Sequence, residues 1–551
     1  MRKKLTGLLA ALMLAVLPLS GCTQIPYDSP PITETTTDAK DPLPESTAAE
    51  EQSKVIPDKY SEKEVNVNPE TYSAVYELEE AEGQTSQHYL MGYSGDGFIA
   101  LSAYETVTLK VYAPSAQYYS LSVYMCAFDT GIDVIVGDGA DYSGDSVRYH
   151  GVSKGAIYIE DVTNFEPFML NGIYLKKGDN TVTLQCVSGT AYMDRVEIAN
   201  GRTVTDGFYT MNTTPINPNA DTRTVKIMNW FGQLYGEKTI TGQQVTIGTN
   251  AEIAAVYETA GRLPAIRVSD LTFAQSRSPY YDEELTDLGL AREWAELGGL
   301  VGYDWTWYSP SDSSHYLSAA SDFNFSRAYT DSDLSMASPE TLERIYGGGE
   351  ISRETFRLIQ DMDEIAEVLK TLMDSGVTVL FRPLADAGSG GYWWSESSEA
   401  YLWLWRTMVK RFNEYHGLTN IIWVWSGEAA DFYPGDEYVD IIGEDIYNTS
   451  GDSGNTRFMG TAYYNAGAVA AAMTDCLLLP DPDVLAQDNA RWLWFSLGRG
   501  DTLIDENGTL TQRYTDNALL ERAYNHESFI TLDELPDFRG YPASGQQMAV
   551  M

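Results

Sequence analysis

Histidine and cysteine are scarce in this chain. Of its 551 residues, five are His and four are Cys (Cys22, Cys126, Cys186 and Cys476), and the histidines show neither an HExxH pattern nor paired spacing. So few cysteines exclude a disulfide-dense scaffold and a zinc site built from several thiolates. Zinc-dependent hydrolysis is therefore not expected, and no cofactor for catalysis is predicted.

Basic residues are also few. Lys and Arg total 36 against 79 Asp and Glu, which gives a formal net charge of −43. Phosphate backbones would repel such a chain, so no nucleic-acid partner is expected, whereas a neutral ligand is compatible with this charge. The length indicates more than one domain. All twelve Trp lie beyond residue 222, so the two halves of the chain differ in kind.

Residues 1–22 have the pattern of a bacterial lipoprotein signal. Three basic residues at positions 2–4 precede a short apolar segment, and Leu19-Ser-Gly-Cys22 fits a lipobox, in which the Cys thiol is acylated. The alternatives are an ordinary secretory signal or a short transmembrane helix, but the apolar segment is too short to span a bilayer comfortably. We therefore expect a signal peptide over residues 1–21 and a lipid anchor at Cys22, on the extracellular face of a bacterial membrane.

Residues 22–70 are rich in Thr, Ser, Pro, Glu and Asp and have no apolar period. Such a segment cannot bury enough apolar surface to fold. We expect a disordered tether that holds the following domains away from the membrane.

Residues 71–200 consist of short segments in which apolar and polar residues alternate, for example Val107-Thr-Leu-Lys-Val-Tyr and Ser120-Leu-Ser-Val-Tyr. Gly, Asp and Asn turns separate them, and no long helical pattern occurs. A period of two with frequent turns predicts a β-sandwich. A linker over residues 201–222 is expected to follow it.

Three motifs of this predicted sandwich resemble carbohydrate-binding module family 35: Glu77-Leu-Glu79, the hairpin that begins at Lys177-Gly-Asp-Asn, and the closing Met193-Asp194-Arg-Val-Glu-Ile. The resemblance implies that Glu77, Glu79 and Asp194 hold a structural calcium, a cation that prefers oxygen ligands. The alternative is that they are surface charges on edge strands. Because this module lacks Trp, any stacking on sugar would have to come from Tyr or Phe, and the module is either a binder or a spacer.

From residue 223 to 551, strand candidates alternate with helical patterns. The candidate strands are residues 239–244, 264–270, 298–305, 377–384, 420–425, 439–447, 469–475 and 491–495. Eight strands with intervening helices predict a (β/α)8 barrel, whose active sites form at the C-terminal ends of the strands. A doubly wound sheet is the alternative, but no GxGxxG or P-loop motif supports it.

Several barrel motifs resemble glycoside hydrolase family 26, the β-mannanase family. They are Phe381-Arg-Pro-Leu, Gly391-Tyr-Trp-Trp394, Asn420-Ile-Ile-Trp-Val-Trp-Ser-Gly, Gly443-Glu-Asp-Ile-Tyr447 and Pro480-Asp-Pro-Asp. The resemblance implies β-mannan or manno-oligosaccharide as the partner. It also implies a retaining mechanism, in which one carboxyl group is the acid/base and a second, about 5–5.5 Å away, is the nucleophile.

The two catalytic positions depart from the family pattern. Where the family has Arg-Pro-Leu-His-Glu, this chain has Arg382-Pro-Leu-Ala385-Asp386, and where it has Ser-Glu-Cys-Gly, this chain has Thr474-Asp475-Cys476-Leu. The third-strand Trp-His pair is Trp305-Thr306, and Gly498 replaces the eighth-strand Trp. Each carboxylate is retracted by roughly 1.5 Å, and a misplacement of about 1 Å can cost on the order of 10²-fold in rate.

The aromatic residues of the predicted cleft look better preserved. Rings at predicted strand ends are expected to stack on sugar; they are Trp305, Trp307, Trp393, Trp394, Trp425 and Tyr447. Arg382 belongs to the same site and is expected to order it rather than to touch sugar. Other side chains are assigned to the core (Trp403, Trp405, Trp423, Trp492 and Cys476) or to solvated loops (Glu428, Asp431 and Glu444).

Three functions follow from these patterns. The first is a lipid-anchored protein that binds β-mannan with little or no hydrolysis. The second is an active retaining endo-β-1,4-mannanase, or a related β-glycanase, that uses Asp386 as acid/base and Asp475 as nucleophile. The third, a surface protein in which neither module binds, is disfavoured by the cleft aromatics.

Overall fold

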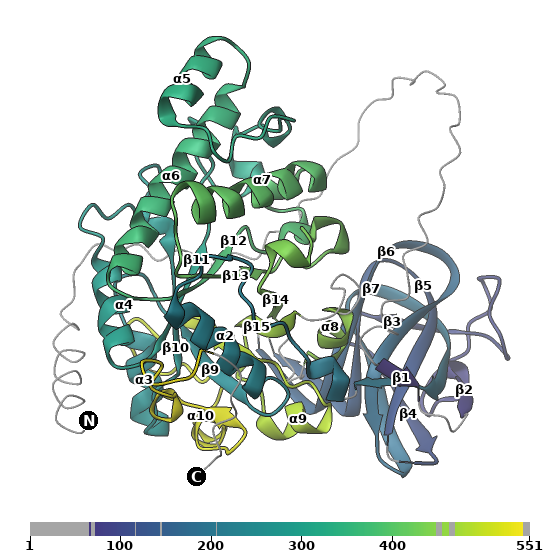
Figure 1. Ribbon diagram of the computed structural model, residues 1–551. Coiled ribbons are helices and arrows are strands. Elements are labelled where there is room, and N and C mark those ends of the chain that lie inside the picture. Colours follow the sequence, from purple (N-terminus) through teal and green to yellow (C-terminus); the bar gives the residue numbers. More distant parts are fainter. Residues whose placement is uncertain are drawn as a thin grey trace, which may run out of the picture.

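The computed structural model describes residues 65–67, 72–115, 117–143, 146–204, 206–447, 454–461 and 469–543. A β-rich module, purple to blue in Figure 1, lies beside an α/β barrel, teal to yellow. The predicted signal peptide, the lipidation site Cys22 and nearly all of the predicted tether lie outside the described residues.

The first module is an antiparallel sheet structure in which β7 is central. Along its length β7 pairs with β2, β3 and β4, and it also pairs with β5, which in turn pairs with β6. Bulges in β5 interrupt these long ladders, and a bulge bends a strand and increases its twist. The strands are β2 (Ser73–Glu77), β3 (Ile99–Ser102), β4 (Thr106–Ala113), β5 (Gln117–Ser143), β6 (Ser146–Leu175) and β7 (Gly178–Asn200).

Alternation along these strands builds the core of the module. In β4, exposed and buried residues alternate without interruption, so that Val107, Leu109, Val111 and Ala113 all face the core. This is the pattern of a sheet with one solvated face, and the predicted β-sandwich is confirmed.

A short second sheet lies at the junction of the two modules. β1 (Val65–Val67) pairs antiparallel with β8 (Arg202–Val204), so regular structure extends into the predicted tether and the predicted linker. Phe208 and Tyr209 then pack into the barrel core. The predicted linker is therefore in part a strand and in part a component of the barrel.

The second module is the predicted (β/α)8 barrel. Eight parallel strands close on themselves because β10 pairs with β9 as well as with β11, and β17 (Phe529–Ile530) adds to β9 on the outside. The barrel strands are β9 (Thr239–Gln244), β10 (Ile266–Asp270), β11 (Leu300–Trp305), β12 (Val379–Pro383), β13 (Ile421–Trp425), β14 (Ile441–Ile446), β15 (Ala470–Cys476) and β16 (Trp494–Leu497).

Helices surround this barrel in Figure 1, and α5 and α6 extend from one side of it. They are α2 (Thr222–Leu234), α3 (Ala251–Ala260), α4 (Thr286–Glu296), α5 (Pro339–Gly347), α6 (Arg353–Asp374), α7 (Ser398–Lys410), α8 (Asn455–Gly460), α9 (Pro482–Gln487) and α10 (Asn517–Tyr524). Ser352 and Ser397 cap the N-termini of α6 and α7, where each hydroxyl accepts from an otherwise unpaired backbone N–H.

The barrel strands are buried on both faces. All five residues of β13, Ile-Ile-Trp-Val-Trp, are buried, as expected for a parallel strand that is covered by helices outside and by side chains inside. Polar side chains consequently collect where the strands end, and there they line the site described below.

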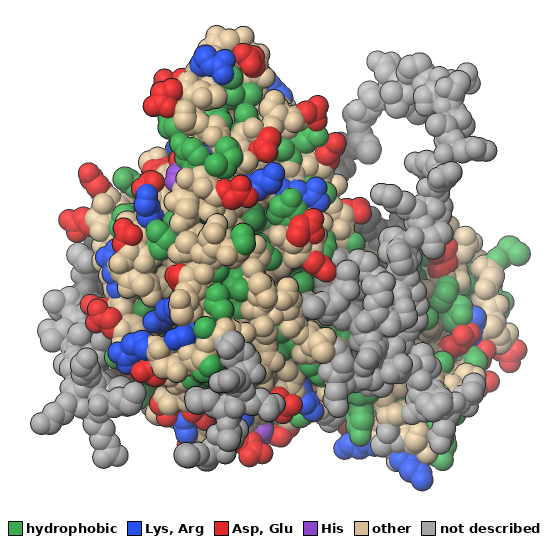
Figure 2. Space-filling model, in the orientation of Figure 1, with side chains coloured by type: hydrophobic (Ala, Val, Ile, Leu, Met, Phe, Trp, Pro, Cys, Tyr) green, Lys and Arg blue, Asp and Glu red, His purple; other side chains and the backbone are tan. Residues whose placement is uncertain are grey.

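The outer surface is acidic, and in the view of Figure 2 its acidic side chains do not gather in one patch. Figure 2 shows carboxylates spread over both modules, with fewer basic side chains among them. Within the described ranges, no helix combines the length and the apolar character needed to cross a bilayer.

Candidate active site

A cavity opens at the C-terminal ends of the barrel strands, where barrel enzymes hold their active sites. It encloses about 760 Å³, including space open to solvent. It is lined by Gln244, Asp270, Thr272, Asp304, Trp305, Thr306, Tyr308, Tyr316, Arg382, Ala385, Asp386, Tyr392, Trp394, Asp445, Tyr447, Asp475 and Arg499. Both predicted catalytic positions, Asp386 and Asp475, therefore face the same space.

Asp386 follows β12 on a backbone with unusual dihedral angles. Leu384 (φ 54°) and Asp386 (φ 52°) both have positive φ, a conformation that costs energy for residues other than glycine and is held by its surroundings. The Asp386 N–H donates to the Ser426 carbonyl at 2.7 Å, and the indole N–H of Trp394 donates to the Ala385 carbonyl at 2.9 Å. The turn that carries Asp386 is thus fixed by the loop after β13 and by the Trp394 ring.

Asp475 lies within β15, opposite Asp445 of β14. A register shift after Glu444 inserts one residue into β15 at this point, so Asp475 pairs with Asp445. The Tyr447 hydroxyl donates to Asp475 Oδ2 at 3.0 Å. Asp475 is 5% exposed, so its carboxyl group lies in the cavity wall with little access to solvent.

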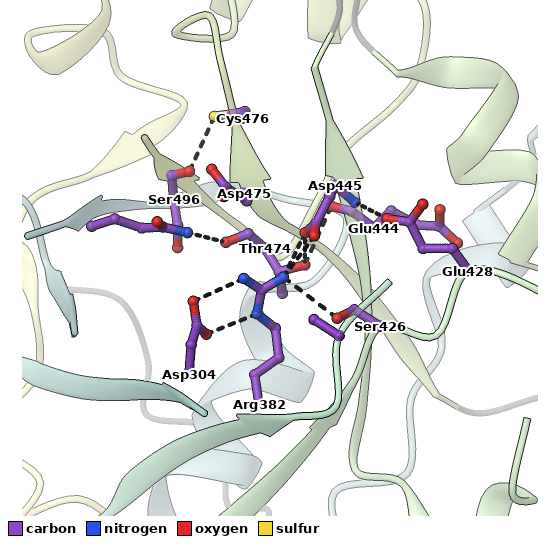
Figure 3. Close-up of polar contacts among 12 residues, drawn as sticks. Asp304, Arg382, Ser426, Glu428, Glu444, Asp445, Thr474, Asp475, Cys476 and Ser496 are labelled. Carbon is purple, nitrogen blue, oxygen red and sulfur yellow. Dashed lines mark hydrogen bonds and ion pairs between the residues drawn. The ribbon is translucent and has the colours of Figure 1, made fainter. Parts of the chain in front are cut away.

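Arg382 joins the two sides of the cavity. Strand register places Asp304 beside Arg382, and Figure 3 shows the guanidinium between Asp304 and Asp445. Its Nε donates to Asp304 Oδ1 at 2.8 Å and its Nη1 to Asp445 Oδ1 at 2.6 Å. All three side chains are largely buried, at most 13% exposed, so Arg382 links two carboxylates in the wall of the cavity.

The electrostatics of the cavity favour protonated carboxyl groups. Burial, and then the charge of Asp445, raise the pKa of Asp386 to about 6 and that of Asp475 to about 7. Arg382 opposes the shift at both positions. The same two causes therefore act on both residues.

Two carboxylates assigned to solvated loops are buried instead. The side chains of Glu428 and Glu444 are 9% and 3% exposed, and Arg457 of α8 contacts them at 2.6 and 3.1 Å. Glu428 also accepts from the Asp445 N–H at 2.8 Å. The prediction of solvated charges is wrong for these two, because the β13 loop folds back against β14, whereas Asp431 is exposed as expected.

The predicted sugar-stacking rings separate into two layers. Trp305, Trp394 and Tyr447 line the cavity. Trp307, Trp393 and Trp425 do not line it; they are 0–1% exposed within the hydrophobic core, so the prediction that they stack on sugar is wrong. Trp307 lies beyond the end of β11 and Trp393 lies in a short helical turn, so strand alternation does not decide which of these rings reach the cavity. Trp405, Trp423 and Trp492 are buried core residues, as predicted, and so is Cys476. Trp403, also assigned to the core, is only partly buried and packs against the core from outside.

Sequence reasoning missed a second group of rings. Tyr308, Tyr316 and Tyr392 line the cavity with Trp394, and Tyr392 stacks on Trp394 at 4.6 Å. Leu317 pairs with Tyr392 through an isolated β-bridge. The loop after β11 and the loop after β12 thus meet to form one wall, and a search for Tyr at both strand ends could have found it.

Asp270, Asp304, Asp445 and Arg499 were also missed as cavity residues. Asp304 and Asp445 stand in the Tyr-Asp-Trp and Glu-Asp-Ile-Tyr segments at strand ends, and that position alone could have marked them. Thr306 stands where the family pattern has His. Its hydroxyl donates to Asp270 at 2.6 Å, so this position holds a short side chain that is hydrogen-bonded to a carboxylate.

Gly498 leaves the end of the eighth strand without a ring. A Cβ atom built there would lie 3.0 Å from the Thr502 hydroxyl and 3.7 Å from Asp475 Oδ1. No side chain therefore projects from position 498 toward Asp475. Ala385, at the other expected His position, lines the cavity with a methyl group.

In the first module, Glu77, Glu79 and Asp194 converge on the loop at residues 92–97. The Ser94 hydroxyl donates to Glu77 at 2.8 Å, the Ser94 N–H donates to Asp194 at 2.8 Å, and the Asp96 N–H donates to Glu79 at 2.7 Å. Arg195 also pairs with Asp194. Across the described part of the chain, no group of three or more His, Cys, Asp or Glu has the arrangement of a metal site, and the calcium site stays a prediction.

Comparison with known proteins places this geometry in a family. The model of glycosyl hydrolase family 26 matches residues 216–530. The mannan endo-1,4-beta-mannosidase of Thermothelomyces thermophilus is 25% identical over 481 residues, which cover 85% of this chain and 91% of the relative. Mannan endo-1,4-beta-mannosidase B of a Piromyces species is 25% identical over 459 residues, 82% of this chain and 74% of the relative.

Solved structures agree on the architecture. A GH26-CBM35 β-(1,4)-mannanase of Podospora anserina is 24% identical, with a TM-score of 0.54. The match covers 85% of this chain and 99% of the mannanase. A β-mannanase from a symbiotic protist of the termite Reticulitermes speratus, complexed with gluco-manno-oligosaccharide, covers 60% of this chain with 25% identity and a TM-score of 0.52, and 99% of its own length is matched. With a family match over more than half of its residues, this chain belongs to glycosyl hydrolase family 26.

Proposed function

We propose that this chain binds β-mannan or its oligosaccharides in the barrel cavity and hydrolyses them slowly or not at all. The observation that carries the proposal is the chemistry of the two catalytic positions. Both hold Asp, and burial and Asp445 raise the pKa of both, to about 6 and about 7. Burial and the charge of Asp445 act in the same direction on both groups, so these two main causes do not separate a protonated acid from an ionised nucleophile, which a retaining mechanism requires.

The backbone around Asp386 supports this proposal. A shorter side chain could be compensated if its backbone advanced into the cavity. Here the Asp386 N–H is bonded to Ser426 and the Gly388 N–H to Gly427, at 2.7 and 2.9 Å. The turn is therefore held against the loop after β13. A shift of the backbone does not recover the roughly 1.5 Å of reach that the shorter side chain loses.

The walls of the cavity support sugar binding. Rings of Trp305, Tyr308, Tyr392 and Trp394 line it beside carboxylates and Arg499, which is the combination of apolar surface and a few polar groups that sugar sites use. Both relatives are mannan endo-1,4-beta-mannosidases, and we extend mannan as a ligand class to this chain.

We also propose the cellular setting. Acylation of Cys22 after removal of residues 1–21 would anchor the chain to the extracellular face of a bacterial membrane, with residues 22–70 as spacer. Globomycin, which blocks lipoprotein signal cleavage, should then shift the mass of the cell-associated protein, and a Cys22→Ser variant should be released from membranes. A Cys22→Ser variant that stays in the membrane fraction would contradict the anchor.

The second candidate is an active retaining endo-β-1,4-mannanase, or a related β-glycanase, with Asp386 as acid/base and Asp475 as nucleophile. Two observations favour it: both carboxyl groups line one cavity, and the Tyr447 hydroxyl donates to Asp475. That hydrogen bond stabilises the ionised form, as a nucleophile needs.

Reducing-end release from galactomannan and glucomannan decides between the two. The protein would start at residue 65, so that β1 is kept, and an Asp386→Ala, Asp475→Ala variant would be measured alongside. No release, with the polymer retarding both proteins in an affinity gel, is the result we expect. Release that disappears in the variant would establish the enzyme, and neither release nor retardation would remove mannan as the ligand.

A further inference from the structure

We propose that Asp361, on α6 outside the barrel strands, is a positioning residue that sets the aromatic wall of the cavity. The inference rests on the proposed binding function. It assigns a role to a buried carboxylate that does not itself line the cavity and that the sequence patterns did not single out.

Asp361 gathers donors from two different strand-end loops. Its Oδ2 accepts from the indole N–H of Trp307 at 2.9 Å and from the Gln275 amide at 3.1 Å, and Arg277 pairs with Oδ1. The Asp361 side chain is 1% exposed. Gln275 and Arg277 follow β10 and Trp307 follows β11, so one carboxylate of α6 ties both loops to the same point.

The first branch runs through Trp307 to the cavity. The Trp307 ring stacks on the Trp305 ring, 4.0 Å between centroids and 17° between planes, and Trp305 lines the cavity. The Trp307 carbonyl accepts from the Trp393 indole N–H at 2.7 Å. Trp393 contacts Trp394 edge to face at 5.3 Å. The orientation of Trp307 therefore governs the rings on two sides of the wall.

The second branch runs through Gln275. Its amide donates to the Tyr308 carbonyl at 2.5 Å, and its carbonyl oxygen accepts from the Tyr308 N–H at 2.9 Å. Tyr308 lines the cavity and packs against Tyr316 at 5.4 Å. Asp361 accepts from the same amide nitrogen, so it reinforces this orientation of Gln275 and helps to hold the backbone that carries Tyr308.

The two branches give Trp307 and Trp393 a role. They stand behind the rings that would contact sugar and hold them in place, as the supporting layer of a precise site must. Loss of Asp361 would remove the acceptor of the buried Trp307 indole N–H and one of the two acceptors of the Gln275 amide, which favours other orientations of the Trp307 ring and loosens Gln275.

Binding of mannohexaose by calorimetry tests the proposal with three variants. Asp361→Ala is expected to weaken the affinity by about tenfold or more, equivalent to roughly 1.4 kcal/mol. Asp361→Asn keeps one acceptor oxygen for Trp307 and Gln275, so it should recover most of the affinity although it loses the Arg277 ion pair. Asp287→Ala is the matched control: Asp287 is also buried and paired with an arginine, Arg267, and does not line the cavity, so it should stay within about twofold of the wild type.

Circular dichroism in the ultraviolet supplies a readout that needs no ligand. Two indoles stacked as closely as Trp305 and Trp307 give an exciton couplet, which Trp307→Phe calibrates. Asp361→Ala should lose the couplet, and Asp361→Asn and Asp287→Ala should keep it. If the wild type does not bind mannohexaose, the proposed function fails and the couplet alone decides. A folded Asp361→Ala protein that keeps the couplet overturns the inference, whatever its affinity.

Discussion

The two modules each bring carboxylates together, and they neutralise them differently. In the barrel, Asp304 and Asp445 share Arg382, and none of the three side chains is more than 13% exposed. The negative charges are partly offset inside the protein by Arg382 of β12, which lies next to β11 and is separated from β14 by β13. A site built this way is rigid, because moving any member uncovers a buried charge.

In the first module, Glu77, Glu79 and Asp194 meet at a loop rather than at an arginine. Backbone N–H groups and the Ser94 hydroxyl supply most of the donors. Arg195, 20% exposed, pairs with Asp194 and also with Glu197, which lies outside this group. An excess of negative charge therefore remains. The comparison teaches that the barrel has one buried arginine for two carboxylates, whereas the module has one partly exposed arginine for three, and so has more negative charge for the predicted calcium to offset.

The largest expected effect concerns the reach of the two barrel carboxyl groups. Replacing Asp386 and Asp475 together by Glu restores both methylenes without altering Arg382 or Asp445. We expect release of reducing ends from glucomannan to rise by about 10²-fold or more over the natural chain. Initial rates at equal protein concentration measure it.

The single variants are the controls. Each should gain less than the double variant, because a retaining mechanism needs both groups in place. A double variant that folds, binds mannan and stays as slow as the natural chain would show that the missing His and Trp positions, rather than reach, limit the chemistry.

The difference in neutralisation predicts different costs for losing an arginine. Arg382→Met leaves Asp304 and Asp445 buried together, and we expect it to lower the free energy of unfolding of the barrel by about 3–5 kcal/mol. Arg195→Met should cost the module less, about 1–3 kcal/mol, because the buried Asp194 keeps the N–H and the hydroxyl of Ser94 as donors. Urea unfolding, followed by Trp fluorescence for the barrel and by far-ultraviolet circular dichroism for the module, measures the two losses of unfolding free energy. Equal losses would contradict the proposed difference between the two carboxylate groups.

The stability of the barrel should depend on pH through its catalytic positions. The pKa values of Asp386 and Asp475, about 6 and about 7, lie above the usual 3.8, so the folded state binds these protons more tightly than the unfolded state. The resulting stabilisation is complete below pH 3.8 and is lost as the pH rises through 6 and 7.

Between pH 5 and pH 8, we therefore expect the free energy of unfolding to fall by roughly 1–3 kcal/mol more in the natural chain than in an Asp386→Asn, Asp475→Asn variant. The variant carries the same general charge repulsion, so the difference isolates the two groups. Parallel pH profiles for the two proteins would mean that neither pKa is shifted.

The smallest effect tests the charge left over in the first module. If calcium binds at Glu77, Glu79 and Asp194, millimolar Ca²⁺ should raise the unfolding temperature of the module by a few degrees and leave the barrel unchanged. Glu79→Gln should abolish the rise, whereas Glu105→Gln, on another loop of the same module, should retain it. An equal rise in all three proteins would place the cation elsewhere.

Much of the barrel was predictable from local pattern. Strand β13 reads as a continuous apolar segment, and its end at Trp425 was found to the residue because parallel strands are buried on both faces. Asp386 and Asp475 were found by motif and do face one cavity. What sequence could not give is which carboxylates share a counterion, because Asp304, Arg382 and Asp445 are brought together by register between strands far apart in the chain.

The rings show the limit more sharply. Trp393 and Trp394 are neighbours in sequence with the same local composition, yet only Trp394 lines the cavity. A short helical turn at residues 393–395 turns one ring inward and the other toward Phe323 and Phe325 of the preceding loop. Tertiary contact, rather than periodicity, decides which of the two could meet a sugar.

The pairing of β1 with β8 has a mechanical consequence. Val65 lies opposite Val204, so the chain enters this small ladder and leaves it toward the barrel at the same end. A pull on the chain before residue 65, resisted by the barrel, would therefore peel the ladder open one bond at a time instead of shearing it. While the ladder holds, the force passes directly from β1 to β8 and bypasses residues 68–201. The first module therefore bears tension only after β1 has detached from β8.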